Sequence, residues 1–114
     1  MSVRFITLPR FSAMELANQA LDGKSNLFES DGLVTINLDQ VQSVQKGSSH
    51  DEVSARGLTF RPTCIEMLDR NIKVAIDYLA LAEALQGNVQ RKADKLAWLQ
   101  SHLIQPEEIG RAHV

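Results

Sequence analysis

The chain has 114 residues with a formal net charge of −2; 44% of them are hydrophobic and 23% are charged. This composition is typical of one soluble globular domain that can bury a core, and it excludes a broad positive field that would attract nucleic acid. The single Cys64 excludes an intramolecular disulfide, and no run approaches the roughly 18 apolar residues of a membrane span. Because the start of the chain holds no long apolar stretch typical of a secretory signal, we expect a cytoplasmic protein.

The chain begins with a strand pattern and a helix that has clear end signals. Residues 3–8 carry apolar side chains on both faces of a strand, which predicts a strand that is central in its sheet or covered on both sides, and Pro9 ends it. Ser12 and Glu15 fit a capping box, and Gly23 favours the left-handed conformation that ends a helix. We therefore expect a helix over 13–21. The residues expected to form its buried stripe are Met14, Ala17 and Leu21.

Alternating apolar and polar residues then predict strands separated by turns. We expect a short strand at 27–29 and a longer one at 33–38. Over 38–40 the apolar residues fall out of period-two phase, which predicts a tight turn or bulge before a strand at 41–46. The polar segment 47–51 is expected to be a mobile loop.

The second half of the pattern predicts two more strands and a hairpin. Residues 52–60 read as one strand with a bulge at Gly57, and 64–68 as the next. Asp69-Arg70-Asn71 is typical of a hairpin connection in which Asn71 adopts positive φ. The returning strand is expected to place Ile72, Val74 and Ile76 on one side.

Two helices are predicted near the end of the sequence. Asp77 is placed to cap a helix over 78–86, which Gly87 ends. A second amphipathic helix over 89–104 ends before Pro106. The fold class expected from all elements is α+β: a curved antiparallel sheet of about five strands with one N-terminal helix and two C-terminal helices. One domain is expected to cover 1–105, and 106–114 to be a frayed tail.

The segments INLDQVQSV (36–44) and LDRNIKV (68–74), followed by a short helix, resemble the small bacterial flagellar FlbD-like proteins. In that family too, a strand ends in an asparagine, a turn leads to a second short strand, and a hairpin precedes a terminal helix. The resemblance covers 33–85 and implies a small curved sheet with helices in a bacterial protein of poorly defined function, without an active site. The chain departs from the family by an insertion over 11–31 and by the second helix after Gly87.

Residue types that carry chemistry are scattered along the sequence. His50, His102 and His113 lie in three different segments, and the acidic neighbours of His50 are more typical of a solvated loop than of a metal site. Cys64 opens an apolar strand, where a free cysteine usually acts as a small hydrophobe. The glycines form neither a Walker loop nor a dinucleotide fingerprint. We therefore expect no catalytic, cofactor or metal site, and we expect that the protein is not an enzyme.

Two surfaces remain as candidates for function. The leading expectation is a protein-interaction or assembly module that forms a homodimer through an exposed sheet edge or through the last helix. The interface residues on that helix would be Leu96, Trp98, Leu99 and Leu103, although the same residues also fit a helix that simply covers the sheet. The alternative is a nucleic-acid-binding accessory protein that uses a basic face of the later strands. The residues of that face would be Arg56, Arg61, Arg70 and Lys73.

Overall fold

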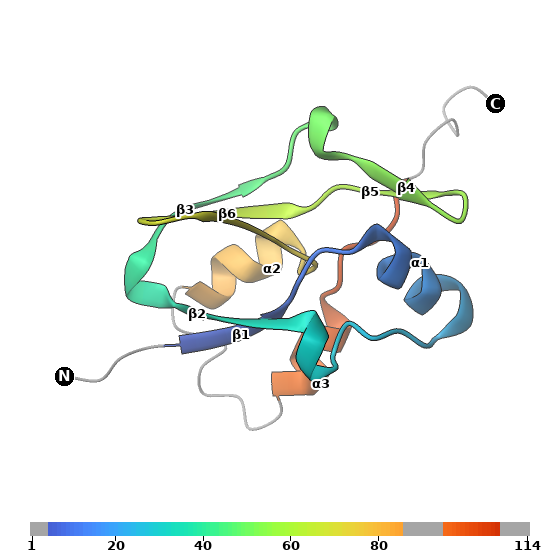
Figure 1. Cartoon of the computed structure of the whole chain (residues 1–114), viewed down its shortest axis with the longest axis horizontal. Helices are drawn as coiled ribbons and strands as arrows, with labels where there is room; N and C mark the ends of the chain where they lie inside the picture. Colours follow the sequence, from blue (N-terminus) through green and yellow to red (C-terminus); the bar gives the residue numbers. More distant parts are fainter. Residues whose placement is uncertain (1–4, 86–94, 108–114) are drawn as a thin grey trace.

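In the computed structural model of the chain, residues 5–85 and 95–107 are described (Figure 1). These residues form seven β-strands and three α-helices, which confirms the α+β class. The strands are β1 (Phe5–Pro9), β2 (Leu33–Asn37), β3 (Val41–Lys46), β4 (Val53–Ala55), β5 (Leu58–Phe60), β6 (Thr63–Met67) and β7 (Asn71–Val74). The helices are α1 (Ala13–Asp22), α2 (Tyr78–Glu83) and α3 (Lys95–Ser101), with 3₁₀ turns η1 (Ser30–Gly32), η2 (Leu38–Gln40) and η3 (Ser49–Asp51).

The strands form three small antiparallel sheets rather than the one curved sheet of about five strands that the sequence predicts. The sheets are β1–β2, β3–β6–β7 and β4–β5. The first two sheets meet at one corner, where Arg10 bridges Val74 and Phe11 N–H donates to Lys73 C=O at 3.0 Å. The contact continues to Ala75, whose N–H donates to Pro9 C=O at 2.9 Å, and the chain then turns into α2 after Asp77.

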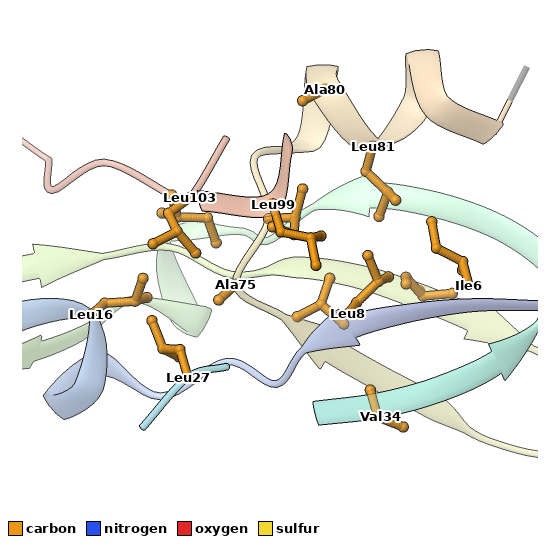
Figure 2. Packing of buried hydrophobic residues seen from close by; sticks show 14 of the residues in the cluster. Ile6, Leu8, Leu16, Leu27, Val34, Ala75, Ala80, Leu81, Leu99 and Leu103 are labelled. Atoms are coloured by element: carbon orange, nitrogen blue, oxygen red, sulfur yellow. The ribbon is translucent and has the colours of Figure 1, made fainter. Parts of the chain in front are cut away.

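The prediction that the first strand is central or covered on both sides is wrong, because β1 belongs to a two-stranded sheet with β2 and has one exposed face. Ile6 and Leu8 are buried, but Phe5 is 53% exposed and Thr7 is exposed as well. Figure 2 shows the reason: Leu81 of α2 and Leu99 of α3 pack on the side of the ribbon where Ile6 and Leu8 lie. Because the helices cover one face only, the other face of the β1–β2 ribbon meets solvent.

The predicted ends of the first helix are confirmed, whereas its predicted stripe is wrong. Ser12 Oγ accepts from Glu15 N–H at 3.3 Å, and Gly23 ends the helix with φ of 72°. Glu15 does not close the capping box; its Oε1 accepts from Asn26 N–H at 2.9 Å instead. The buried residues are Ala13, Leu16 and Ala17, while Met14 and Leu21 are about half exposed. The buried face is thus displaced from the predicted one, and of the predicted residues it keeps only Ala17.

The segment predicted as one strand over 52–60 is a hairpin. β4 and β5 pair through Ala55 and Leu58, and the two residues between them turn the chain with φ of 51° at Arg56 and 82° at Gly57. Two successive positive φ values match the turn that the right-handed twist of a hairpin favours. Gly57 therefore makes a turn instead of a bulge, and the expected short strand at 27–29 is also a turn, with Leu27 buried.

The turn at 38–40 and the bulge at the start of β3 are confirmed. Asn71 belongs to β7 and has no positive φ, because the hairpin connection closes earlier with Met67 N–H donating to Arg70 C=O at 2.8 Å. The 3₁₀ turn η3 occupies the loop predicted over 47–51, and Ser48 and Asp51 form a capping box there. This loop is therefore held by its own hydrogen bonds.

The C-terminal part returns to the sheets. Asp77 Oδ2 caps α2 by accepting from Leu79 N–H at 3.1 Å and Ala80 N–H at 3.3 Å, as predicted; Gly87 and residues 89–94 lie outside the described residues. α3 ends at Ser101 and not at 104, since Ile104 N–H donates to Ala75 C=O at 2.8 Å in an extended segment. The chain remains attached as far as Glu107, whose N–H donates to Thr59 C=O at 2.7 Å.

Candidate interaction surfaces

Side chains that could carry chemistry do not gather at one site. Within the described ranges no three histidine, cysteine, aspartate or glutamate side chains are placed to hold a metal ion. Cys64 lies opposite Lys73 in the β6–β7 ladder, and burial, followed by the charge of Asp51, raises the pKa of its thiol. A raised pKa disfavours the thiolate, so Cys64 is poorly suited to act as a nucleophile. His50 is exposed on η3, and His113 lies outside the described residues.

The four residues predicted as an interface on the last helix do not share one surface. Leu99 and Leu103 belong to the hydrophobic core, with exposed fractions of 7% and 8%. Trp98 is half-buried against the core and stacks on His102 with 4.8 Å between ring centroids. Leu96 alone of the four is largely exposed, at 50%. This segment therefore places Leu99 and Leu103 in the core and leaves Leu96 and part of Trp98 at the surface.

Two of the four residues of the predicted basic face are paired with carboxylates in separate places. Arg56 Nη1 lies 2.6 Å from Asp22 Oδ2 and 3.0 Å from Asn18 Oδ1, so it ties the β4–β5 turn to α1. Arg61 lies 3.3 Å from Glu52 and 3.7 Å from Glu107. Neither arginine is free to hold the backbone of a nucleic acid without breaking these pairs.

The structure does bring together the other two residues of that face. Arg70 and Lys73 line one groove of about 330 Å³ together with Arg10, which sequence reasoning missed. Arg10 directly follows β1 and reaches the groove through its bridge to Val74. No local pattern marks this long-range pairing, so the sequence offered no signal for the third cation. The remaining groove residues are Phe11, Val34, Asn71 and Ile72.

Two other hollows carry both signs of charge. One of about 220 Å³ between the ends of β3 and β6, the start of α2 and the C-terminal segment is lined by Lys46 and Arg61 as well as by Asp77 and Glu107. The other, of about 300 Å³ beside the start of α1, holds Arg10 next to Glu15 and Asp31. Neither hollow is lined by Cys64 or His50. The groove of Arg10, Arg70 and Lys73 differs from both because no carboxylate lines it.

The outer edge of β2 is the second surface that stands out. Arg10 N–H donates to Gly32 C=O at 2.8 Å. In an antiparallel pair every second residue forms the hydrogen bonds between the strands, so in the register of β1 and β2 these are the even-numbered residues. The N–H and C=O groups of Thr35 therefore point away from β1. Among the described residues no backbone group satisfies them.

The side chains of β2 do nothing to block this edge. The strand reads LVTIN, without charge or proline, whereas native edge strands are usually protected by such residues. By contrast, β3 carries Lys46 and a bulge, and β4 has only three residues. β1 is uncharged as well, but it contains Pro9, and the chain directly after it is bridged to Val74 through Arg10. Among the strands of the described chain, β2 thus combines a free edge with five uncharged residues and no proline. The sequence predicted an exposed sheet edge without identifying the strand.

The chain matches no family model, no curated protein and no solved structure. The resemblance to the FlbD-like proteins accordingly stays a prediction. In the described ranges none of the helices combines the length and hydropathy that crossing a bilayer requires.

Proposed function

We propose that the chain is an interaction module without catalytic activity that forms a homodimer through the β2 edges of two copies. The observation that carries this proposal is the free, uncharged outer edge of β2. Such an edge presents unsatisfied backbone groups to solvent and is a ready template for another strand. A second copy of the same strand is the simplest occupant, because most soluble oligomers are symmetric homo-oligomers.

The sequence of β2 fits pairing with itself. An antiparallel pair with its two-fold axis at Thr35 sets this residue opposite its own copy, where the two exchange N–H and C=O hydrogen bonds. In that register Val34 of one copy stands opposite Ile36 of the other, on the face that already points into the core. Apolar cross-strand pairs of this kind stabilise a sheet, so the pairing extends the core instead of interrupting it.

The outer face of the ribbon suggests what the dimer is for. Phe5 is 53% exposed on this face, and Thr7 Oγ1 and Thr35 Oγ1 lie 2.7 Å apart beside it. Joining two ribbons creates one four-stranded sheet that presents this face twice. A two-fold repeated, weakly polar surface suits the docking of a partner protein, which is the assembly role proposed here.

The proposal is tested by charging the edge. Sedimentation velocity of the native chain should show a dimer at micromolar concentration, and Thr35→Lys should weaken it about fivefold or more, because two like charges then face each other across the axis. Thr7→Lys is the matched control: it adds the same charge on the same exposed face and removes the same hydroxyl pair, but on the strand away from the proposed joint. A native monomer, or equal weakening by both variants, would contradict the proposal.

Two other functions have less support. Of the four residues predicted as an interface near the last helix, Leu99 and Leu103 are buried, which leaves Leu96 and part of Trp98 for contact. The basic face proposed for nucleic acid loses Arg56 and Arg61 to carboxylates. Each alternative has therefore lost two of the four residues on which it depends.

A further inference from the structure

The groove lined by Arg10, Arg70 and Lys73 concentrates positive charge on a chain whose overall charge is −2. Three of its seven lining residues are cations, and none is a carboxylate. In the hollow near the start of α2, Lys46 and Arg61 stand beside Asp77 and Glu107, so their charges offset each other. Arg10 also lines the hollow that holds Glu15 and Asp31, but neither carboxylate forms an ion pair with it. The excess of positive charge in this groove is therefore not explained by ion pairs within the fold.

Two of the three cations are free to bind a ligand. Among the residues that the structure describes, no carboxylate forms an ion pair with Arg10 or Arg70, and both are exposed. Lys73 Nζ lies 3.4 Å from Asp51 Oδ1, but its side chain is 55% exposed and the pair is a surface one. Surface pairs contribute little, so an anion in the groove competes with Asp51 for Lys73 at small cost.

The other lining residues define what kind of anion fits. Phe11, Val34 and Ile72 give the groove apolar walls, and Asn71 adds an amide that both donates and accepts hydrogen bonds. A volume of about 330 Å³ lies at the lower end of the range for small-molecule sites. Two guanidinium groups and an ammonium match the charge and the acceptor oxygens of a phosphate group, while the apolar walls suit the part of the molecule that carries it.

We propose that this groove binds a small phosphate ester, with Arg10, Arg70 and Lys73 holding its phosphate group. A nucleic-acid strand is the less favoured occupant because a polymer needs cations along several phosphates. Outside the groove, Arg56 and Arg61 are occupied by Asp22, Glu52 and Glu107. The groove shares only Val34 with the proposed β2 joint, and its three cations come from other segments, so variants at Arg70 and at Thr35 test the two proposals separately.

The test uses the full chain, labelled with ¹⁵N, and four probes: AMP, adenosine, inorganic phosphate and a single-stranded oligonucleotide. AMP and phosphate should shift the amide signals of Arg10, Asn71 and Lys73, whereas adenosine, which lacks the phosphate, should not. Loss of one charged hydrogen-bond donor in Arg70→Gln or Arg10→Gln should weaken AMP binding about tenfold or more. Both residues are exposed, so both variants should retain the native spectrum elsewhere.

Two further variants separate a built site from general attraction of anions. Arg56→Gln removes the same charge from a position paired with Asp22 and should leave AMP binding unchanged. Asp51→Asn removes the competitor of Lys73 while retaining a capping oxygen for Ser48, and should tighten AMP binding by up to about fivefold.

Three results would overturn the proposal. The first is the absence of any shift at the groove with millimolar AMP or phosphate at low salt. The second is equal weakening by Arg56→Gln and Arg70→Gln, because this would show attraction by net charge alone. The third is that the oligonucleotide binds far more tightly than AMP and that its affinity falls with salt as steeply as contacts to several phosphates require. This would make the occupant a nucleic acid.

Discussion

Replacing Thr63 with valine tests how far one buried hydrogen bond stabilises the junction between β6 and the segment that leads into α2. Thr63 is 1% exposed, and its Oγ1 donates to the C=O of Ile76 at 2.6 Å. Ile76 is itself fully buried. Valine has the same shape as threonine, so the substitution removes the donor without leaving a cavity.

The expected effect follows from the carbonyl group that is left behind. A buried acceptor without a partner costs about 1–3 kcal/mol, and part of this is offset because valine is more apolar and favours strands. We expect a net loss of about 1–2 kcal/mol in the free energy of unfolding. For a chain of 114 residues this corresponds to a melting temperature lower by about 4–8 °C.

The assay is thermal and urea denaturation followed by circular dichroism, with Thr59→Val as the control. Thr59 Oγ1 pairs with Ser54 Oγ at 2.8 Å in an exposed position, so water replaces this hydrogen bond and the change should stay within about 0.5 kcal/mol. If the two valine variants are equally stable, or if Thr63→Val matches the native chain, the buried hydrogen bond does not have the role assigned to it.

Two more predictions concern α3 and η3. Leu99→Ala should lower the free energy of unfolding by about 2–5 kcal/mol because Leu99 is buried. Leu96→Ala, on the exposed side, should change it by less than about 0.5 kcal/mol. Equal effects of the two substitutions in urea denaturation would refute the assignment of Leu99 to the core. The Ser48 backbone N–H, at 2.8 Å, and then its hydroxyl lower the pKa of Asp51 below its ordinary 3.8. Because the folded-state pKa is the lower one, this stabilisation is present above pH 3.8 and is lost as the pH falls through the folded-state pKa. An NMR titration in which the Asp51 carboxyl group has a pKa of 3.8 or higher would contradict it.

The parts of the fold that were predicted correctly are those set by neighbouring residues. Ser12, Gly23 and Asp77 act within one helical turn of their own positions, and the structure confirms all three caps. The same holds for the turn at 38–40, where the phase of the apolar residues changes. Local signals of this kind need no knowledge of the tertiary structure.

The errors concern residues whose surroundings come from distant segments. Arg56 adopts a positive φ that is uncommon for a long side chain, so the hairpin lacked its usual sequence signature. In α1 the buried face contains two alanines, which give a weak hydrophobic signal beside the larger Met14 and Leu21. For the candidate site, Arg70 and Lys73 were predicted, but Arg10 was missed because it joins them only through the bridge to Val74.

Amide hydrogen exchange of Thr35 measures the central claim most directly. In a single copy its N–H points away from β1 and has no partner among the described residues, whereas in the proposed dimer it donates to the second copy. Exchange at Thr35 should slow as the protein concentration rises through the dimerisation range, while Thr7, on the opposite edge of the ribbon, should exchange at a constant rate. Fast exchange at Thr35 at every concentration would contradict the proposed pairing of β2.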